Sequence, residues 1–159
     1  MAIIYTQNKI KKNIKKIIVD DHLYHYLNSF KWYASGPKGY AYSNVLKTTM
    51  HRFLLGLTKG DNIQGDHINR NTFDNRLENL RRCTLAQNAV NRNPRGTSKY
   101  MGVNLVNSGS WRAQLHHNRI KYTLGYYENE EDAAKAYDKK AIEMHGEFAN
   151  LNFKQLTNI

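Results

Sequence analysis

The chain has very little cysteine and no long apolar run, and these absences exclude several classes of protein. Cys83 is the one cysteine among 159 residues, so an internal disulfide and a zinc site built from cysteine pairs are both excluded. No apolar run approaches the roughly 20 residues that a membrane-spanning helix needs, and no basic leader precedes an apolar stretch at the N-terminus. We therefore expect a cytoplasmic protein that is neither secreted nor bound to a membrane.

Acidic residues are also scarce. The chain has 13 Asp and Glu residues against 24 Lys and Arg residues, for a formal net charge of +11. Hydrophobic residues make up 40% of the sequence and include 11 tyrosines and five phenylalanines, enough for the core of one domain or two small ones. A positive surplus of this size indicates a polyanionic partner, and nucleic acid is the commonest one inside cells.

The charge is distributed unevenly along the chain. Residues 1–50 carry eight basic residues against two acidic ones, and residues 51–98 carry eight against four. In the last third, residues 99–127 carry four basic residues and no acidic one, whereas residues 128–147 carry seven acidic residues against three lysines. This pattern predicts one basic and one acidic face for the C-terminal region.

Proline and glycine in residues 91–98 cannot continue a helix and indicate a linker. We predict an N-terminal region over residues 1–92, a linker at 93–98 and a C-terminal region over 99–159. The lysine-rich segment 9–16 favours a solvated edge beside a strand, and contact with a DNA backbone is the alternative.

Hydrophobic patterning in the N-terminal region predicts short elements. Asp20 is expected to cap a short helix, and Thr84 with Gln87 forms a capping box at the start of another. The predicted strands are 14–19, 31–34, 39–45 and 80–83, with a helical turn at 50–55.

Four polar residues have a spacing that suits phosphodiester chemistry. Asn79 follows His67 by 12 residues and Asn88 follows nine residues later, while Asp66 directly precedes the histidine. If a hairpin forms with a helix packed across it, a carboxylate, an imidazole and an amide converge. Oxygen ligands from Asp66 and Asn88 suit a hard divalent cation, and His67 suits a base beside it. The alternative, an ordinary turn with a hydrogen-bonded histidine, does not explain the spacing.

Residues 50–92 resemble the HNH endonucleases with a ββα-metal finger, through Met50-His51-Arg52, the Asp-His pair and the Asn-Arg-Leu-Glu-Asn-Leu-Arg and Gln-Asn motifs. The asparagine at the third signature position is typical of the phage and group-I-intron branch. The resemblance implies that His67 is the general base and that Asn79 braces the loop that orients it. It also implies that Asp66 and Asn88 bind one Mg²⁺ or Mn²⁺ ion, with His51 and Arg52 near the scissile phosphate.

Arginines cluster around this motif, and guanidinium groups pair well with phosphate. Six of the nine arginines lie between residues 70 and 95. Arg70 stands where the family usually has glycine and is expected to add a phosphate contact. By contrast, Asn69, Asn71 and Asn75 are expected to be loop formers. The predicted DNA contacts here are Arg70, Arg76, Arg81 and Arg82.

The C-terminal region predicts three strands, at 100–106, 111–116 and 119–127, and one helix that begins after Asn129 and ends at Gly146. An apolar helix stripe predicts packing on the sheet; it comprises Ala133, Ala136, Tyr137, Ala141 and Met144. The fold class expected for the whole chain is α+β, a ββα-metal nuclease domain followed by a three-stranded antiparallel sheet packed on one helix.

Residues 98–153 resemble the plant ethylene-response-factor (apetala-type) DNA-binding domain, through Tyr100-Met-Gly-Val, Trp111-Arg-Ala, Leu124-Gly-Tyr, Ala133-Ala-Lys-Ala-Tyr-Asp and Leu151-Asn-Phe. The resemblance implies that the sheet enters the major groove of DNA. Met101 and Asn104 stand where the plant domains usually have arginine, so the plant target sequence is not transferred. The predicted DNA contacts are Trp111, Arg112, Arg119 and Lys121, with a core position as an equal alternative for Trp111.

Together these features predict a monomeric, metal-dependent endonuclease of the homing type that cuts double-stranded DNA, acting in the host cytoplasm if a phage encodes it. The alternative is a sequence-specific DNA-binding regulator with an inactive nuclease motif. The sequence leaves open the DNA target and the choice between nicking and double-strand cleavage.

Overall fold

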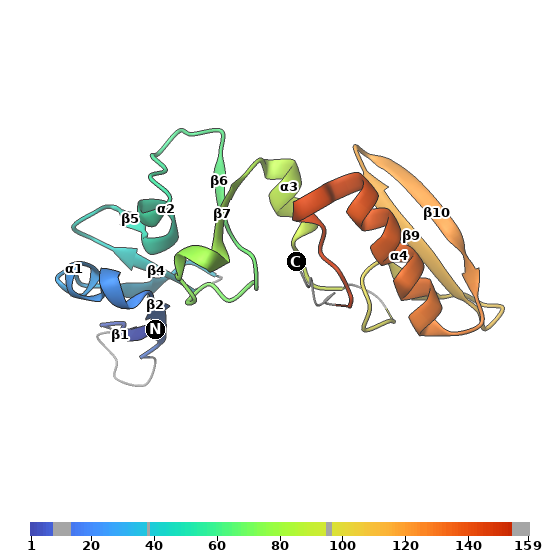
Figure 1. Cartoon of the computed structure of the whole chain (residues 1–159), viewed down its shortest axis with the longest axis horizontal. Helices are drawn as coiled ribbons and strands as arrows, with labels where there is room; N and C mark the ends of the chain where they lie inside the picture. The colour runs from blue at the N-terminus through green and yellow to red at the C-terminus, as the bar shows by residue number, and fades with distance from the viewer. Residues whose placement is uncertain (8–13, 38, 95–96, 154–159) are drawn as a thin grey trace. The chain divides into compact units, whose positions relative to one another are not determined.

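The computed structural model describes residues 1–7, 14–37, 39–94 and 97–153. The chain divides into two compact units, Met1–Asn88 (unit 1) and Ala89–Ile159 (unit 2), and both combine antiparallel sheet with helix (Figure 1). The division falls within a helix just before the expected linker. Residues 9–13 of the lysine-rich segment and Arg95 lie outside the described residues. Within the described ranges, no helix combines the length and apolarity needed to cross a membrane.

Unit 1 contains three small antiparallel sheets. A two-stranded sheet pairs β1 with β2, a three-stranded sheet has the order β3-β4-β5, and a hairpin pairs β6 with β7. The elements in chain order are β1 (Ala2–Tyr5), β2 (Lys16–Val19), η2 (Asp21–Leu23), α1 (Tyr24–Asn28), β3 (Tyr33–Ser35), β4 (Tyr40–Ser43), β5 (Thr48–Thr49), α2 (Met50–Leu54), β6 (Gln64–His67), η3 (Leu77–Asn79), β7 (Leu80–Cys83) and α3 (Leu85–Val90).

The core of unit 1 gathers around the first hairpin. Ile17 and Val19 are fully buried because alternate residues of β2 face the interior. Trp32 is also buried, and its indole Nε1 donates a hydrogen bond of 2.8 Å to the carbonyl of Leu27. Strand β1 was not among the predicted elements, because four residues at the chain start give little periodicity. Burial of Ile4 shows that β1 belongs to this core.

The first hairpin is also bonded to the polar segment that follows β6. The Ile18 amide donates to the Phe73 carbonyl and the Asn75 amide donates to the Ile18 carbonyl, each at 2.8 Å. Asp20 stands at the N-cap position of η2 but makes no capping bond there. Its carboxylate accepts from the Leu77 amide at 2.8 Å instead, which makes Asp20 a long-range tether.

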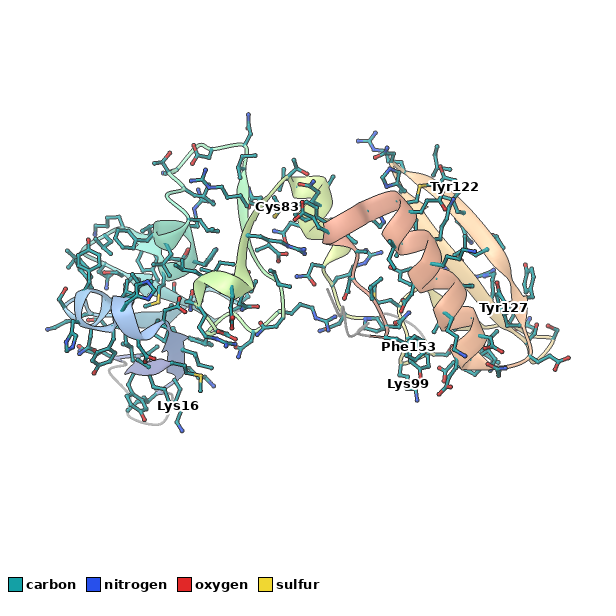
Figure 2. The ribbon with its side chains drawn as sticks, in the orientation of Figure 1. Lys16, Cys83, Lys99, Tyr122, Tyr127 and Phe153 are labelled. Atoms are coloured by element: carbon teal, nitrogen blue, oxygen red, sulfur yellow. The ribbon has the colours of Figure 1, made fainter. Side chains whose placement is uncertain are left out.

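Unit 2 is a three-stranded sheet covered by one long helix. Its strands β8 (Val103–Leu105), β9 (Trp111–His117) and β10 (Ile120–Tyr127) have the order β10-β9-β8. Helix α4 (Glu130–His145) packs against all three, and η4 (Gly146–Phe148) follows it. The Asn129 side chain caps α4 by accepting from the Asp132 amide at 2.8 Å, as predicted. Tyr122 and Tyr127, toward opposite ends of β10 (Figure 2), both pack into the core beneath α4.

A close approach at Gly102 fixes how the helix meets the sheet. The residue has φ +71°, and a Cβ atom there would lie 2.0 Å from a ring carbon of Tyr137 and 2.5 Å from the Gln114 carbonyl oxygen. The Gly102 carbonyl accepts from the Gln114 amide at 2.8 Å. Only glycine satisfies both the backbone conformation and the contact with α4.

Candidate functional site

The hairpin of β6 and β7 carries the polar residues singled out in the sequence. Its register pairs Asp66 with Arg81 and His67 with Leu80. The Asp66 and His67 side chains are buried, with residues only 7% and 4% exposed. Burying a carboxylate and an imidazole costs free energy unless each has polar partners. This end of the hairpin must therefore supply polar partners for both side chains.

Two histidines and a tyrosine form a ring cluster at this site. The ring centroids of His51 and His67 lie 4.8 Å apart, and the Tyr40 ring lies 5.0 Å from His51 and 6.0 Å from His67. Helix α2 therefore brings His51, a residue of the sequence prediction, beside His67.

Burial favours the neutral form of both imidazoles in this cluster. Burial, followed by repulsion from His67 and Arg52, lowers the pKa of His51 to about 3. Burial also lowers the pKa of His67, against the opposing effects of the Asn75 hydrogen bond and the Asp66 and Asp74 carboxylates. A neutral imidazole can accept a proton near neutral pH, as a general base must.

Asn79 ties together the loop that follows β6. Its Nδ2 donates to the Asp74 carbonyl at 2.7 Å and to Asn69 Oδ1 at 3.0 Å, and its Oδ1 accepts from the Asn69 amide at 2.9 Å. Further along, Asn69 Oδ1 accepts from the Asn71 amide and Asn71 Oδ1 accepts from the Phe73 amide, so both are loop formers as predicted.

Asn75 contacts the histidine directly, which the sequence did not indicate. The residue is 1% exposed, and its Oδ1 lies 3.3 Å from His67 Nε2. An asparagine in a polar, asparagine-rich loop has no pattern that separates it from its neighbours. Its spacing of eight residues from His67 could have been noticed, but nothing local tells which loop asparagine turns inward.

Asp66 is paired with Arg81 across the hairpin. The Arg81 Nη2 atom lies 2.9 Å from Asp66 Oδ2, and the two side chains are 15% and 8% exposed. Arg81, which the sequence predicts to contact DNA, thus also holds the carboxylate of the residue predicted to bind a metal.

Other arginines of the cluster are bonded within unit 1. Arg76 binds the Asp74 carboxylate through two nitrogens at 2.8 Å and also pairs with Glu78. The guanidinium groups of Arg52 and Arg82 donate to the carbonyls of Thr58 and Leu55, respectively. These arginines brace the loops around the hairpin, a structural role that residue clustering alone did not distinguish from phosphate binding.

Arg70 is exposed and has φ +65°. Its amide donates to the His67 carbonyl at 2.9 Å, which closes a tight turn. The left-handed backbone explains why glycine is usual at this position in the family that the sequence resembles. Arg70 therefore adds positive charge at the turn next to His67.

Asn88 lies on α3, whose capping box is confirmed by the bonds between Thr84 and Gln87 at 2.8 and 3.2 Å. None of the six residues of α3 is buried, and Leu85 is 70% exposed. Gln87, Asn88 and Val90 are half-buried, and Leu85, Ala86 and Ala89 are exposed.

The donor chemistry of Asp66 and Asn88, one carboxylate and one amide oxygen, fits Mg²⁺ or Mn²⁺. Over the ranges that the structure describes, no three His, Cys, Asp or Glu side chains gather in a way that could hold a metal ion. An ion at Asp66 would thus need an amide, water or a substrate oxygen as a further ligand.

A groove of about 840 Å³ opens in unit 1 beside α2. Its lining includes Arg52 and Gln64, which neighbour His51 and Gly65 in the chain, together with Lys47 and Lys59. Three basic side chains against the one carboxylate of Asp61 suit a polyanion.

The sheet face of unit 2 away from α4 is polar and basic. Ala113 and Leu115 of β9 are buried, so the residues that alternate with them face outward. Pairing with β8 and β10 extends this face across the sheet. We call it the outer sheet face: Asn104, Arg112, Gln114, His116, Lys121, Thr123 and Tyr126.

The four residues predicted to contact DNA in unit 2 lie in different places. Arg112 and Lys121 are on the outer sheet face, and Arg119 lies in the turn between β9 and β10 with φ +65°. Trp111 packs against the core cluster of Val103 and its neighbours, the alternative that the sequence left open. Within the described residues, Arg112 Nε and Gln114 Oε1 are buried without a hydrogen-bond partner.

Known proteins similar to this chain fall into two groups. No family model matches. An uncharacterized HNH endonuclease of Acanthamoeba polyphaga mimivirus is 34% identical over 131 residues, which cover 79% of this chain and 68% of that protein. An ethylene-responsive transcription factor of Medicago truncatula is 38% identical over 65 residues, and APETALA2-like protein 2 of Oryza sativa is 43% identical over 63 residues.

The two plant similarities are short, covering 40% and 38% of this chain but only 24% and 14% of the plant proteins. They indicate a DNA-binding region of the apetala type and nothing about the rest of those proteins. The viral similarity reaches far beyond a short motif, since it spans more than three quarters of this chain and two thirds of the relative. On that basis the chain belongs to the family of HNH endonucleases.

Proposed function

We propose that the protein is a metal-dependent endonuclease that hydrolyses phosphodiester bonds in double-stranded DNA. The observation that carries the proposal is that His67 is buried beside the carboxylate of Asp66 and the ring of His51, and that burial favours its neutral form. A histidine exposed on a surface loop would be hydrated by water and would not require buried polar partners.

In the proposed reaction, His67 takes a proton from a water molecule as its oxygen bonds to phosphorus. The bond between phosphorus and the 3′ oxygen breaks, and the leaving oxygen takes a proton from solvent water, which leaves a 5′ phosphate and a 3′ hydroxyl group. Asp66 and Asn88 would hold one Mg²⁺ or Mn²⁺ ion, which when bound offsets charge that builds on the phosphate and the leaving oxygen.

The remaining residues of unit 1 position this chemistry. Asn79 fixes the loop after His67 through its bonds to Asp74 and Asn69. His51 is neutral, so it would act on the scissile phosphate as a hydrogen-bond donor and not as a cation. Arg52, Arg70 and the basic groove would attract the DNA backbone.

Unit 2 would hold the DNA through its outer sheet face. Arg112 and Lys121 lie on this face and supply positive charge to it. The acidic residues of the first turn of α4 lie on the helix that covers the opposite side of the sheet.

The test is cleavage of supercoiled plasmid by the full-length protein with Mg²⁺ or Mn²⁺, with and without a chelator. We expect nicked or linear product only when the metal is present. Tight, sequence-specific DNA binding without cleavage under any of these conditions would instead support the regulator with an inactive nuclease motif.

A homing role would confine cleavage to one or a few long target sites. Selection of cut sites from a random DNA library should then return one consensus sequence. Scattered cuts without a consensus would contradict the homing role and leave a nonspecific nuclease.

A further inference from the structure

We infer that Asn75 is a positioning residue that orients His67, and that the N-terminal hairpin of β1 and β2 holds Asn75 in place. The catalytic meaning of this inference rests on the proposed nuclease function. The contact itself does not, since it follows from the geometry of the folded chain.

The contact with Asn75 selects one tautomer of His67. Asn75 Oδ1 lies 3.3 Å from His67 Nε2, and an amide oxygen can only accept a hydrogen bond. A hydrogen bond between these two atoms therefore requires the proton of His67 to be on Nε2. A neutral imidazole has one N–H, so its lone pair is then on Nδ1.

Asn75 is held from two sides. On one side, its amide donates to the Ile18 carbonyl and the Ile18 amide donates to the Phe73 carbonyl, both at 2.8 Å. On the other side, Asn79 Nδ2 donates to the carbonyl of Asp74, the residue before Asn75, at 2.7 Å. Asn79, a residue of the HNH motif, thus acts on His67 indirectly. It bonds to the backbone of Asp74, which directly precedes the residue that contacts His67.

The N-terminal hairpin is therefore part of the site. Strand β2 supplies the Ile18 carbonyl, and Asp20 just beyond it accepts from the Leu77 amide at 2.8 Å. Ile17 and Val19, on either side of Ile18, are fully buried in the core. The position of the loop is consequently set by a packed strand and not by the loop alone.

The side-chain amide group of Asn75 is only partly hydrogen-bonded in the described part of the chain. Within the described residues its Nδ2 atom is buried without a hydrogen-bond partner, although the residue is only 1% exposed. A buried donor without a partner destabilises a fold. A leucine of similar volume would remove that donor, so the presence of asparagine here favours a role for its oxygen.

The test compares Asn75→Leu, which removes the acceptor, with Asn75→Asp, which keeps an oxygen in the same place. Asn44→Leu, the same change at an exposed position of unit 1, is the matched control. For Asn75→Leu we expect kcat for DNA cleavage to fall about 10- to 100-fold, as for other partners that orient functional histidines. KM and DNA affinity should stay at the wild-type values.

Asn75→Asp should recover most of the cleavage lost in Asn75→Leu, because it restores an acceptor for His67 Nε2. Equal losses in both variants, or losses in KM as large as those in kcat, would overturn the positioning role. Trp32 fluorescence of each variant, in a Trp111→Phe background, reports whether unit 1 is still folded, since this buried tryptophan lies in its core.

The tautomer of His67 is measured by ¹⁵N NMR of labelled full-length protein, with His67→Ala used for assignment. We expect the proton on Nε2 in the wild type and a mixture of tautomers in Asn75→Leu. A proton on Nδ1 in the wild type would overturn the inference. Absence of all cleavage by the wild type would refute the proposed function instead, while the tautomer would still decide whether Asn75 orients His67.

Discussion

The two units of this protein bury different kinds of side chain. Unit 1 buries a connected set of polar residues around the β6–β7 hairpin, among them His51, Asp66, His67, Asn75 and Asn79. Unit 2 instead packs small apolar residues of α4 against the sheet. Polar burial costs free energy unless the buried groups have hydrogen-bond partners, and in unit 1 several of those partners belong to the same polar cluster.

The buried polar residues of unit 2 have structural roles. The Asp138 carboxylate accepts from the Asn152 and Phe153 amides at 2.8 and 2.9 Å. The Ser98 hydroxyl accepts from the Tyr100 amide at 2.9 Å. These bonds fix the chain at either end of the sheet and helix. The comparison indicates that unit 1 carries the chemistry and that unit 2 presents a surface.

The first prediction tests this division with the largest expected effect. His67→Ala should lower the rate of plasmid cleavage by about 10²- to 10⁴-fold, the usual contribution of a general base. DNA affinity, measured by fluorescence anisotropy, should not change. Parallel losses of affinity and cleavage would show that His67 binds DNA and would contradict the division of roles between the two units.

The second prediction concerns the fold of unit 2. Gly102→Ala should destabilise it by about 2–5 kcal/mol, because it adds a strained left-handed residue and a clash with Tyr137. Gly109→Ala is the matched control, since that glycine also has positive φ (+81°) but no atom within 4 Å of its Cβ position. The control should cost only the strain, about 1–2 kcal/mol.

The two tryptophans allow the units to be observed separately. Trp32 belongs to unit 1 and Trp111 to unit 2. In a Trp32→Phe background, denaturant unfolding followed at Trp111 should show the loss caused by Gly102→Ala. In a Trp111→Phe background, the Trp32 transition should not move. A shared shift would mean that the two units unfold as one.

The third prediction is that the stabilities of the two units depend differently on pH. His51 has a folded pKa of about 3, whereas an unfolded histidine titrates near 6.5. The unfolded state therefore binds more protons between these values, so the stability of unit 1 is complete above pH 6.5 and falls as the pH drops toward 3. The slope from one such group is at most about 1.4 kcal/mol per pH unit.

Burial of His67 acts in the same direction, because it too lowers the pKa. In unit 2, His145 has a lowered pKa through burial and the neighbouring His117, so a smaller loss is expected there. Unfolding of the single-tryptophan variants from neutral to mildly acidic pH measures both slopes. His51→Gln should flatten the slope of unit 1, and an unchanged slope would contradict the role of His51.

The fourth prediction has the smallest expected effect. Lys121→Ala should weaken DNA binding to all sequences alike and reduce the slope of log affinity against log salt by about 1, as expected for one phosphate contact. Cleavage at saturating protein should keep its wild-type rate. A loss of cleavage at saturation would mean that the outer sheet face also takes part in the chemistry.

Several features of the fold could be predicted because they depend on near neighbours. The capping box of Thr84 and Gln87 and the Asn129 cap are local devices, and both formed as the sequence indicated. The strand at 80–83 and the strand alternation in 111–116 were also readable, because side-chain period follows directly from backbone geometry.

The positions of individual side chains around the hairpin were less accessible. Clustering could not tell that Arg81 pairs with Asp66 or that Arg82 donates to the Leu55 carbonyl, since a long side chain can serve either protein or phosphate. The spacing of the motif residues also says nothing about how much apolar surface α3 buries. None of the six residues of that helix is fully buried.

The sequence by itself determined the residue types and spacings of the candidate site, the helix caps, and the membership in a nuclease family that those motifs indicated. The tertiary structure alone decided that Asn75 contacts His67 and that β2, more than 50 residues earlier in the chain, holds Asn75 in place. The physical reason is that such contacts join distant segments through backbone hydrogen bonds, which any residue can make and which therefore leave no mark in a sequence pattern.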